Sequence, residues 1–282
     1  MLASTTNLGL AILVLAALVL VATVIAAVGA GVITHFDPTQ AVPIDRLLEP
    51  GQRGHLLGTD QIGRDVFARL VYGARLAWIV GIAVSLGSVV GGGVAGAIAG
   101  YLGGIVDLAI TRAVDAILAF PPILLALVFA AIVQPSTGTA VVALVIVYTP
   151  LTTRIMRAAV LAEKQLDYVA ASRGIGNSEI WTLVRHIVPN TLGPLLVVST
   201  LVVSRAIIVE ASLSFLGAGT QPPAASWGVM ISEARSVVLS DPGLVIIPAV
   251  VLSATVLAMN LVADWIGDIL DPTNQAGGAR NR

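Results

Sequence analysis

The chain has 282 residues, of which 57% are hydrophobic and 11% are charged, and its mean hydropathy is +0.95. Soluble domains carry about 25% charged residues, so this composition excludes an ordinary soluble protein and indicates one that crosses a membrane several times. The net charge of −1 argues against a nucleic-acid-binding surface, and the absence of cysteine excludes disulfides and cysteine-ligated metals.

The first apolar run, residues 8–28 (LGLAILVLAALVLVATVIAAV), predicts a retained anchor helix. No basic segment precedes it, and it exceeds the apolar core of a signal peptide, which is about 7–15 residues long. We therefore expect the mature chain to begin with a membrane span.

Six apolar runs are each close to the length of about 20 residues that crosses a bilayer core. They are residues 8–33, 76–100, 116–134, 139–157, 191–216 and 243–266. This pattern predicts an all-α polytopic membrane protein with six transmembrane helices. Residues 87–100 (GSVVGGGVAGAIAG) lie in the second span, and we interpret their glycines as close helix contacts rather than as a gate.

Polar segments follow at residues 34–75, 157–190 and 217–242, with a polar tail at 267–282. Six crossings put both termini and residues 157–190 on one side. That side holds eight basic residues and the other holds six: Arg112, Arg154, Arg157, Lys164, Arg173, Arg185, Arg280 and Arg282, against Arg46, Arg53, Arg64, Arg69, Arg75 and Arg235. Because cytoplasmic loops are enriched in Lys and Arg, we expect the termini and residues 157–190 to be cytoplasmic.

Two polar stretches carry charges whose role stays open. In residues 58–65 (GTDQIGRD), the charged side chains either contact another protein or belong to a local turn held by Asp60. Arg112 and Asp115 are three residues apart, so we expect a solvated pair on one helix face, and a contact with another protein is the alternative.

Residues 163–190 predict a helical hairpin in water. Residues 163–173 (EKQLDYVAASR) form the first helix, and small side chains at Ala170, Ala171 and Ser172 leave a smooth patch near its end. Gly174 and Gly176 end this helix, because glycine adopts positive φ without strain. The second helix, 179–188 (EIWTLVRHIV), is capped by one of two polar residues and ended by a proline: Asn177 or Ser178, and Pro189.

The second helix also predicts an exposed apolar face. Its members are Ile180, Trp181, Leu183, Val184 and Ile187. A solvated connector that touches nothing is the alternative, but such a connector has no reason to keep apolar side chains in water.

This hairpin resembles the EAA loop of permease subunits in ABC importers, in which an E-A-A triplet is followed by Gly and by an Ile-x-Pro end. The matching positions are Ala170, Ala171, Ser172, Gly176, Ile187 and Pro189, with Ala170 in place of the family's glutamate and Ser172 in place of its second alanine. Four further segments resemble the C-type permease of dipeptide/oligopeptide importers: residues 55–75, 101–127, 208–230 and 267–272. The resemblance covers residues 55–272.

The resemblance implies a bacterial cytoplasmic-membrane importer built from several chains. Its expected partners are a second, B-type permease, two ATP-binding subunits or a fused ATPase, an extracytoplasmic substrate-binding protein and the lipid bilayer. It also implies two regions in this chain: an anchor helix with an external segment at 1–54, and a permease domain at 55–282 whose coupling loop spans about 157–190. The expected contacts of this loop with the ATPase are Ala170, Ala171, Ser172, Gly174, Gly176, Asn177 and Ile180. The ATP-hydrolysing partner is also the alternative contact for Arg112 and Asp115.

No enzymatic site is expected in the chain itself. Phosphate-binding loops need a G-x-x-x-x-G-K-[ST] pattern, whereas the only lysine, Lys164, has no glycine nearby. ATP and magnesium are therefore expected on partner subunits, and no cofactor on this chain. His35 and His55 are too scattered among carboxylates for a metal site, and we expect both to be solvated loop residues.

Arg205 is a charge near the middle of the fifth span, where an unpaired cation costs about 2.5–3.5 kcal/mol. It either lines the substrate pathway, together with Glu210, or pairs structurally with the B-type subunit or with Asp264. A direct pair with Glu210 requires bent side chains, since five residues turn a helix by about 140°.

Three rival functions remain. A stand-alone secondary transporter or channel would have inverted repeats and acids at mid-membrane, and the sequence shows no repeat. A purely structural scaffold would not need Arg205 or the hairpin. An importer of the same family could carry nickel or another small ligand instead of peptides.

Overall fold

The structure is a computed structural model, and it describes residues 2–270. Residues 267–270 of the predicted tail (267–282) belong to the last helix. Residues 271–282 lie outside the described range, and they include Arg280, Arg282 and the last two residues of the GDILDP segment (267–272). The chain divides into two compact units, each described separately below. Unit 1 contains Met1–Ala83, Ala126–Ala143 and Val203–Val262, and unit 2 contains Val84–Leu125, Leu144–Val202 and Ala263–Arg282.

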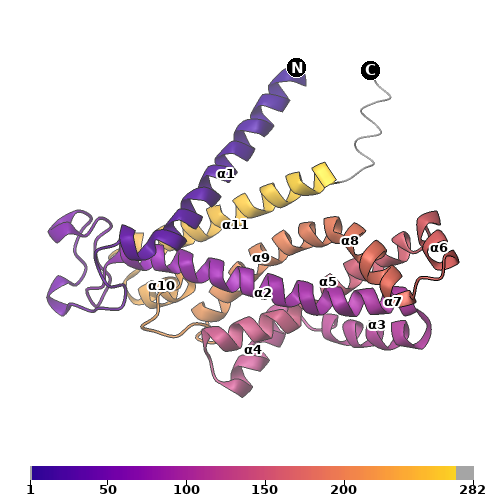
Figure 1. Cartoon of the computed structure of the whole chain (residues 1–282). Coiled ribbons are helices and arrows are strands. Elements are labelled where there is room, and N and C mark those ends of the chain that lie inside the picture. The colour runs from indigo at the N-terminus through magenta and orange to yellow at the C-terminus, as the bar shows by residue number, and fades with distance from the viewer. Residues whose placement is uncertain (1, 271–282) are drawn as a thin grey trace. The chain divides into compact units, whose positions relative to one another are not determined.

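All regular structure between residues 2 and 270 is helical (Figure 1), with one isolated β-bridge between Thr59 and Asp65. The longer helices are α1 (Leu2–Ile33), α2 (Val66–Leu102), α3 (Gly104–Leu118), α4 (Pro122–Val133), α5 (Thr137–Glu163), α9 (Leu192–Phe215) and α11 (Gly243–Leu270). The shorter ones are η1 (Pro43–Asp45), η2 (Gln52–Gly54), α6 (Asp167–Gly174), α7 (Glu179–Thr182), η3 (Leu183–Ile187), α8 (Val188–Asn190), α10 (Trp227–Glu233) and η4 (Ala234–Val237).

Five helices in the described range are long and apolar enough to span a membrane: α1, α2, α5, α9 and α11. The prediction of an all-α polytopic protein is confirmed. The predicted third span, 116–134, is wrong as a single helix, because α3 and α4 meet at 86° across residues 119–121. Pro121 and Pro122 explain the break, since proline removes an N–H donor and pushes the residue before it out of helical geometry. Counting this bent pair as one span gives six.

The second span starts ten residues earlier than predicted, at Val66 instead of residue 76. The Asp65 carboxylate accepts a hydrogen bond from the Ala68 backbone N–H at 2.6 Å, which satisfies one of the free donors at the helix start. Nothing between this cap and the apolar run breaks a helix, so the polar residues 66–75 join the span.

In unit 2, α2 and α5 approach each other closely through glycines one helical turn apart. A Cβ on Gly92 would lie 2.6 Å from the Thr149 carbonyl oxygen, and one on Gly96 would lie 2.5 Å from the Thr153 oxygen. Gly100 repeats the contact, at 2.9 Å from the Arg157 oxygen. The interpretation of this glycine run as a helix contact is confirmed.

Ion pairs link α3 to α5 in the same unit. Arg157 forms a two-point pair with Asp107, with its Nε 2.5 Å from Oδ1 and its Nη2 2.6 Å from Oδ2. Asp115 pairs with Arg154 at 2.5 Å. The expected pair between Arg112 and Asp115 is therefore wrong, because α5 brings a second arginine to the same carboxylate.

In unit 1, the segment of residues 34–65 contacts α10, since Arg64 Nη2 donates to Glu233 Oε2 at 2.7 Å. Asp60 accepts hydrogen bonds from the backbone N–H groups of Ile62 and Arg64, so the local-turn interpretation of residues 58–65 is confirmed. Trp227 is 2% exposed and donates from Nε1 to the Leu70 carbonyl oxygen at 3.0 Å.

His55, which was expected to be solvated, is only 6% exposed. Its Nδ1 lies 2.8 Å from Asp65 Oδ1, and its ring stacks on Phe36 with the centroids 4.3 Å apart. The prediction failed because the carboxylate partner and the aromatic ring come from separate parts of the external segment, which spacing alone does not bring together.

Candidate functional site: the helical hairpin between α5 and α9

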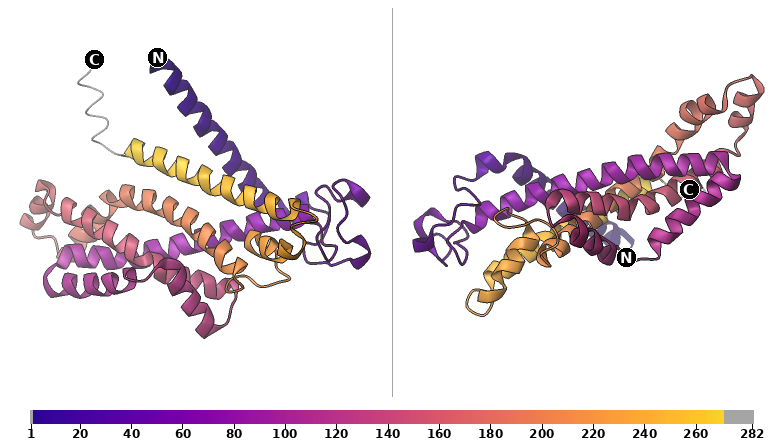
Figure 2. Two further views of the ribbon diagram at one scale, coloured as in Figure 1. Left: turned by 180° about the vertical axis from the view of Figure 1, so that it is seen from behind. Right: turned by 90° about the horizontal axis from the view of Figure 1, so that it is seen from below.

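The hairpin in unit 2 consists of α6 and α7, which follow the end of α5 as a short helical projection (Figure 2). The predicted first helix begins later than expected, because Leu166 is extended and α6 starts at Asp167. Gly176 has φ +87°, a left-handed conformation that favours glycine, whereas Gly174 is the last residue of α6 and lies in open space. The tight turn therefore depends on Gly176.

Hydroxyl and amide groups hold the two helices of the hairpin together. The Ser172 and Thr182 hydroxyls lie 3.1 Å apart, and Asn177 Nδ2 donates to Ser172 Oγ at 3.0 Å. Ser178 is the helix cap, since its Oγ accepts from the Trp181 backbone N–H at 3.2 Å. Of the two predicted caps, Ser178 is therefore correct, and Asn177 braces the turn instead.

Most of the predicted contact residues lie on the hairpin surface. Ala170, Ala171, Gly174, Gly176 and Ile180 are exposed, and Asn177 is partly exposed. Ser172 is only 5% exposed, because it faces the hairpin interior rather than joining the patch of small residues.

The exposed apolar face of the hairpin differs in part from the prediction. Ile180, Trp181 and Val184 are exposed by 76%, 54% and 60%. Ile187 is fully buried and Leu183 is partly buried, so these two were wrongly placed on the surface. Ile175 in the turn is 80% exposed and adds to the face. The hairpin therefore exposes four large apolar side chains: Ile175, Ile180, Trp181 and Val184.

Pro189 does not stop the second helix as predicted. Residues 183–187 widen into the π-helix η3, in which the Val188 N–H bonds to the Leu183 carbonyl five residues back, and α8 and α9 follow directly. A wider turn accommodates a residue that has no N–H and whose ring would clash with the carbonyl four residues earlier. The chain thus stays helical past Pro189 as far as Asn190, and one turn residue, Thr191, separates α8 from α9.

A cluster around Tyr101 connects the hairpin to α2. The Tyr101 hydroxyl donates to Glu179 Oε2, and Lys164 Nζ donates to the Tyr101 carbonyl oxygen at 2.5 Å. Arg173 pairs with Glu179 at 3.2 Å, with its guanidinium 5.4 Å from the Tyr101 ring centroid. Sequence analysis missed this cluster; the single available signal was that the chain's only lysine lies beside the hairpin.

A second tyrosine fastens α6 to its flanking helices. The Tyr168 hydroxyl donates to Glu163 Oε1 at 2.5 Å and accepts from Asn190 Nδ2 at 3.0 Å. Burial and then the bond to the Glu163 carboxylate raise the pKa of Tyr168, so its hydroxyl stays protonated at neutral pH.

Arg205 and Glu210 both lie on α9 in unit 1 but point to different surroundings. Arg205 is exposed and forms no ion pair with another residue of the described range. Glu210 is 2% exposed and accepts hydrogen bonds from the Ser214 hydroxyl at 2.6 Å and the Thr220 hydroxyl at 2.9 Å. The bent-side-chain pair between Arg205 and Glu210 is therefore not formed.

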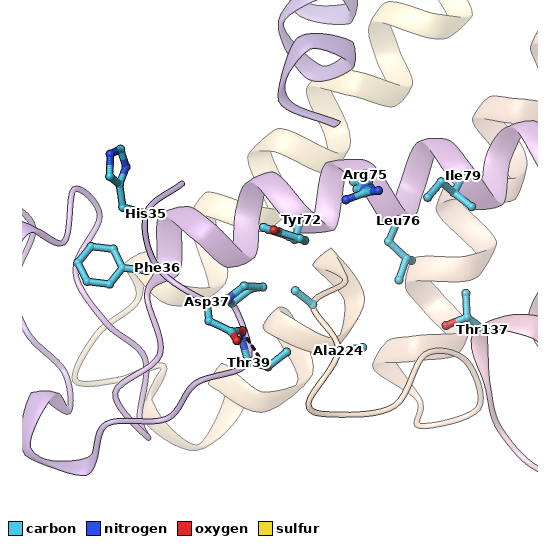
Figure 3. Close-up of a pocket in the computed structure, with 12 residues that line it drawn as sticks. His35, Phe36, Asp37, Thr39, Tyr72, Arg75, Leu76, Ile79, Thr137 and Ala224 are labelled. Carbon is cyan, nitrogen blue, oxygen red and sulfur yellow. Dashed lines mark hydrogen bonds between the residues drawn. The ribbon is translucent and has the colours of Figure 1, made fainter. Parts of the chain in front are cut away.

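Unit 1 also contains a cavity of about 780 Å³ beside the first turns of α2 (Figure 3). Its walls include His35, Asp37, Tyr72, Arg75, Ile79 and Thr137. Hydrogen bonds from the Thr39 side chain and backbone lower the pKa of Asp37, which keeps it ionised. The cavity therefore carries both a carboxylate and a guanidinium. No cluster of three or more potential metal ligands occurs in residues 2–270.

Comparison with known proteins identifies the family. Residues 92–275, more than half of the chain, match the family described as the inner membrane component of binding-protein-dependent transport systems. The dipeptide transport system permease protein DppC of Escherichia coli (strain K12) is 45% identical over 252 residues, covering 87% of this chain and 84% of the relative. A putative peptide transport system permease protein of Brucella suis biovar 1 is 38% identical over 255 residues, with 90% and 86% coverage.

A solved structure supports the fold. The MetNI methionine ABC transporter in inward-facing conformations matches with a TM-score of 0.53 and 19% identity, over 71% of this chain and 96% of that chain. The long apolar helices agree with a multi-pass protein of the inner membrane. By its sequence match, the chain belongs to the family of inner membrane components of binding-protein-dependent transport systems.

Proposed function

We propose that this chain is a permease subunit of an ATP-driven ABC importer that moves dipeptides or oligopeptides across the cytoplasmic membrane by alternating access. The relatives named as dipeptide or peptide permeases support the substrate class, because they align with this chain over nearly its whole length. Peptides are the first choice of substrate, and nickel or another small ligand is the alternative.

The importer needs further chains. A B-type permease forms the pathway with this one, two ATP-binding subunits or a fused ATPase hydrolyse ATP with magnesium, and an extracytoplasmic binding protein delivers the peptide. The family description supports this division of labour, since it specifies a binding-protein-dependent system. This chain itself holds no cofactor.

The hairpin is the surface that the ATPase binds. The observation that carries this assignment is that the hairpin exposes four large apolar side chains together with two small ones: Ile175, Ile180, Trp181, Val184, Ala170 and Ala171. Small side chains allow close approach and apolar ones supply binding energy when they leave water. Ser172 and Asn177 contribute by bracing the hairpin from inside.

Orientation follows from this assignment. The hairpin and both termini face the cytoplasm, and the segment of residues 34–65 faces the exterior. Shifting the populations of the two conformations of a transporter from 1:99 to 99:1 needs roughly 5.5 kcal/mol of differential stabilisation. A hairpin whose helices run on through η3 and α8 into α9 transmits such work better than a flexible loop.

The substrate pathway includes Arg205, which can meet the carboxylate or carbonyls of a peptide. Its exposure on a membrane-spanning helix, without an acidic partner in the described part of the chain, supports this role. Glu210 serves the pathway indirectly, because it holds the turn after α9 through Ser214 and Thr220.

Reconstitution tests the proposal. The chain is inserted into proteoliposomes with its permease and ATPase partners, the binding protein is added on the side of the external segment, and labelled dipeptide uptake is measured. We expect uptake that requires ATP on the hairpin side and that stops when the ATPase is omitted. Uptake by this chain alone under an ion gradient would contradict the proposal, and ATP-dependent uptake of nickel but not dipeptide would change the substrate.

A further inference from the structure

Tyr101 occupies an unusual position for a residue of a membrane-spanning helix. It is the next-to-last residue of α2 and is 4% exposed, yet its hydroxyl and its carbonyl oxygen both bond to the segment that carries the hairpin. Glu179, which accepts its hydroxyl hydrogen bond, lies 78 positions further along the chain. The contact is thus a tertiary link and not a local one.

Three segments converge on this one side chain. Lys164 comes from the turn after α5, Arg173 from the last turn of α6, and Glu179 is the first residue of α7. The Lys164 ammonium lies 5.2 Å and the Arg173 guanidinium 5.4 Å from the Tyr101 ring centroid, within the range of cation–π attraction. Both helices of the hairpin are therefore fastened to the end of α2.

The charged groups of Arg173 and Glu179 are partly exposed to water, so the cluster contributes mainly by fixing positions and not by adding stability. Arg173 and Glu179 have side chains that are 37% and 63% exposed, and ion pairs with such exposure add little stability. A purely stabilising role therefore does not account for a convergence of two cations and a carboxylate on one buried ring.

The hairpin is attached to the α2–α5 pair at two points. It continues covalently from α5, and it is held to α2 through Tyr101. The pair itself is tightly packed, because Gly92, Gly96 and Gly100 bring the backbones of α2 and α5 into direct contact. Besides its covalent links to α5 and α9, the hairpin thus has a side-chain link to α2, which is the contact that can carry its movement directly to that helix.

We propose that Tyr101 is the positioning residue that transmits movement of the hairpin to α2. When the ATPase displaces the hairpin, the Glu179 and Arg173 contacts pull on the end of α2, so that α2 and α5 move together. Without Tyr101, the hairpin keeps its covalent links to α5 and α9 but no longer pulls on the end of α2, and ATP hydrolysis is uncoupled from transport. This inference rests on the proposed function, since it assumes that an ATPase drives the hairpin.

The test compares variants in the reconstituted complex, with peptide uptake and ATP hydrolysis measured together. Tyr101→Leu removes the ring and the hydroxyl, Tyr101→Phe removes the hydroxyl alone, and Glu179→Gln removes the charge on an exposed side chain. We expect peptides transported per ATP to fall by about tenfold in Tyr101→Leu, the size of a moderate coupling free energy, and less in the other two. Complex assembly is expected to stay unchanged in both Tyr101 variants and is measured by co-purification.

Tyr168→Phe is the matched control. It also removes a tyrosine hydroxyl bonded to a glutamate, but the bonds of this hydroxyl join α6 to the end of α5 and to Asn190 of α8 and do not reach α2. We expect its transport per ATP to equal that of the unmodified chain. If Tyr168→Phe lowers the ratio as much as Tyr101→Phe does, the specific role of Tyr101 is excluded.

A rescue experiment separates transmission from folding. The chain has no natural cysteine, so Tyr101→Cys combined with Glu179→Cys can be joined by a short bifunctional thiol reagent. We expect the unlinked double variant to be uncoupled and the linked one to regain transport. The proposal is overturned if Tyr101→Leu transports as many peptides per ATP as the unmodified chain. It is also overturned if Tyr101→Leu does not assemble and Glu179→Gln shows normal transport per ATP. If the proposed function is wrong, the unmodified complex itself shows no ATP-driven uptake.

Discussion

Single residues in unit 1 show how charges are buried in a mainly apolar chain. Arg64 and Arg69 are 2% and 1% exposed, and each donates from Nη2 to the same Glu233 oxygen at 2.7 Å. Asp60 Oδ2 adds a second acid, 2.6 Å from Arg64 Nε. Arg69 Nη1 is buried without a hydrogen-bond partner in the described residues, so this guanidinium depends on the acids that remain.

Removing Glu233 is therefore expected to destabilise unit 1 strongly. In Glu233→Ala, the buried guanidinium groups of Arg64 and Arg69 have only the Asp60 carboxylate as a counter-charge. Removing one partner of a buried ion pair costs about 3–5 kcal/mol of folding free energy. Thermal unfolding of the purified protein should show a lower midpoint, whereas Glu49→Ala, which changes an exposed acid elsewhere in unit 1, should not. Equal midpoints for Glu233→Ala and Glu49→Ala would show that the cluster does not hold the external segment.

Arg205 leads to a different expectation, because it lacks an ion-pair partner within residues 2–270. We expect Arg205→Ala to lower peptide uptake while leaving assembly with the partner subunits intact, as measured by co-purification. Arg46→Ala, which changes an exposed arginine of the external segment, serves as the charge-matched control and should leave uptake unchanged. Loss of assembly in Arg205→Ala would instead favour a structural pair with the B-type subunit.

Among the helices, the contact between α2 and α5 in unit 2 depends on missing side chains. Helices in lipid gain no hydrophobic driving force from each other, so close backbone approach supplies the packing energy. A Cβ on Gly96 would meet the Thr153 oxygen at 2.5 Å, and it would also lie 2.7 Å from Met156 Cβ. Neither neighbour is the flexible end of a side chain, so the helices would have to separate.

The variant Gly96→Ala should consequently destabilise the α2–α5 pair by about 1–3 kcal/mol, the usual cost of overpacking. Gly93→Ala is the control three residues away, since no atom lies within 4 Å of its added Cβ and alanine favours a helix. Thermal unfolding of both variants in the same detergent measures the difference. Destabilisation by Gly93→Ala of the same size would mean that helix propensity and flexibility, not the contact, explain the glycine run.

The helices show how far hydropathy alone predicts structure. The spans now seen as α1, α5, α9 and α11 were located correctly because long apolar runs have few alternatives in lipid. The bend between α3 and α4 was missed, since the run of residues 116–134 is apolar throughout and its two prolines act on backbone geometry rather than on hydropathy. The early start of α2 was missed because the Asp65 cap lies outside the apolar run.

At the scale of the whole molecule, sequence motifs led to the correct family, and the hairpin was located from turn and cap residues. Its interior was not predictable. Ser172 and Ile187 face inward because of contacts made across the hairpin, and the Tyr101 cluster joins residues 78 positions apart. Contacts over such separations depend on the packing of helices, which periodicity in one segment does not encode.

The central claim concerns the whole transporter: an ATPase on the cytoplasmic side binds the hairpin. Because the chain has no cysteine, a single Ala171→Cys provides a unique thiol on the exposed surface of α6, and Ile44→Cys provides one on the external segment, where Ile44 is 80% exposed. Each variant is assembled with its partner subunits in oriented vesicles and treated with a thiol-to-amine crosslinker. We predict that Ala171→Cys crosslinks to the ATP-hydrolysing subunit and that Ile44→Cys does not. Labelling of Ala171→Cys by an impermeant reagent from the extracytoplasmic side, with no crosslink to the ATPase, would contradict the account.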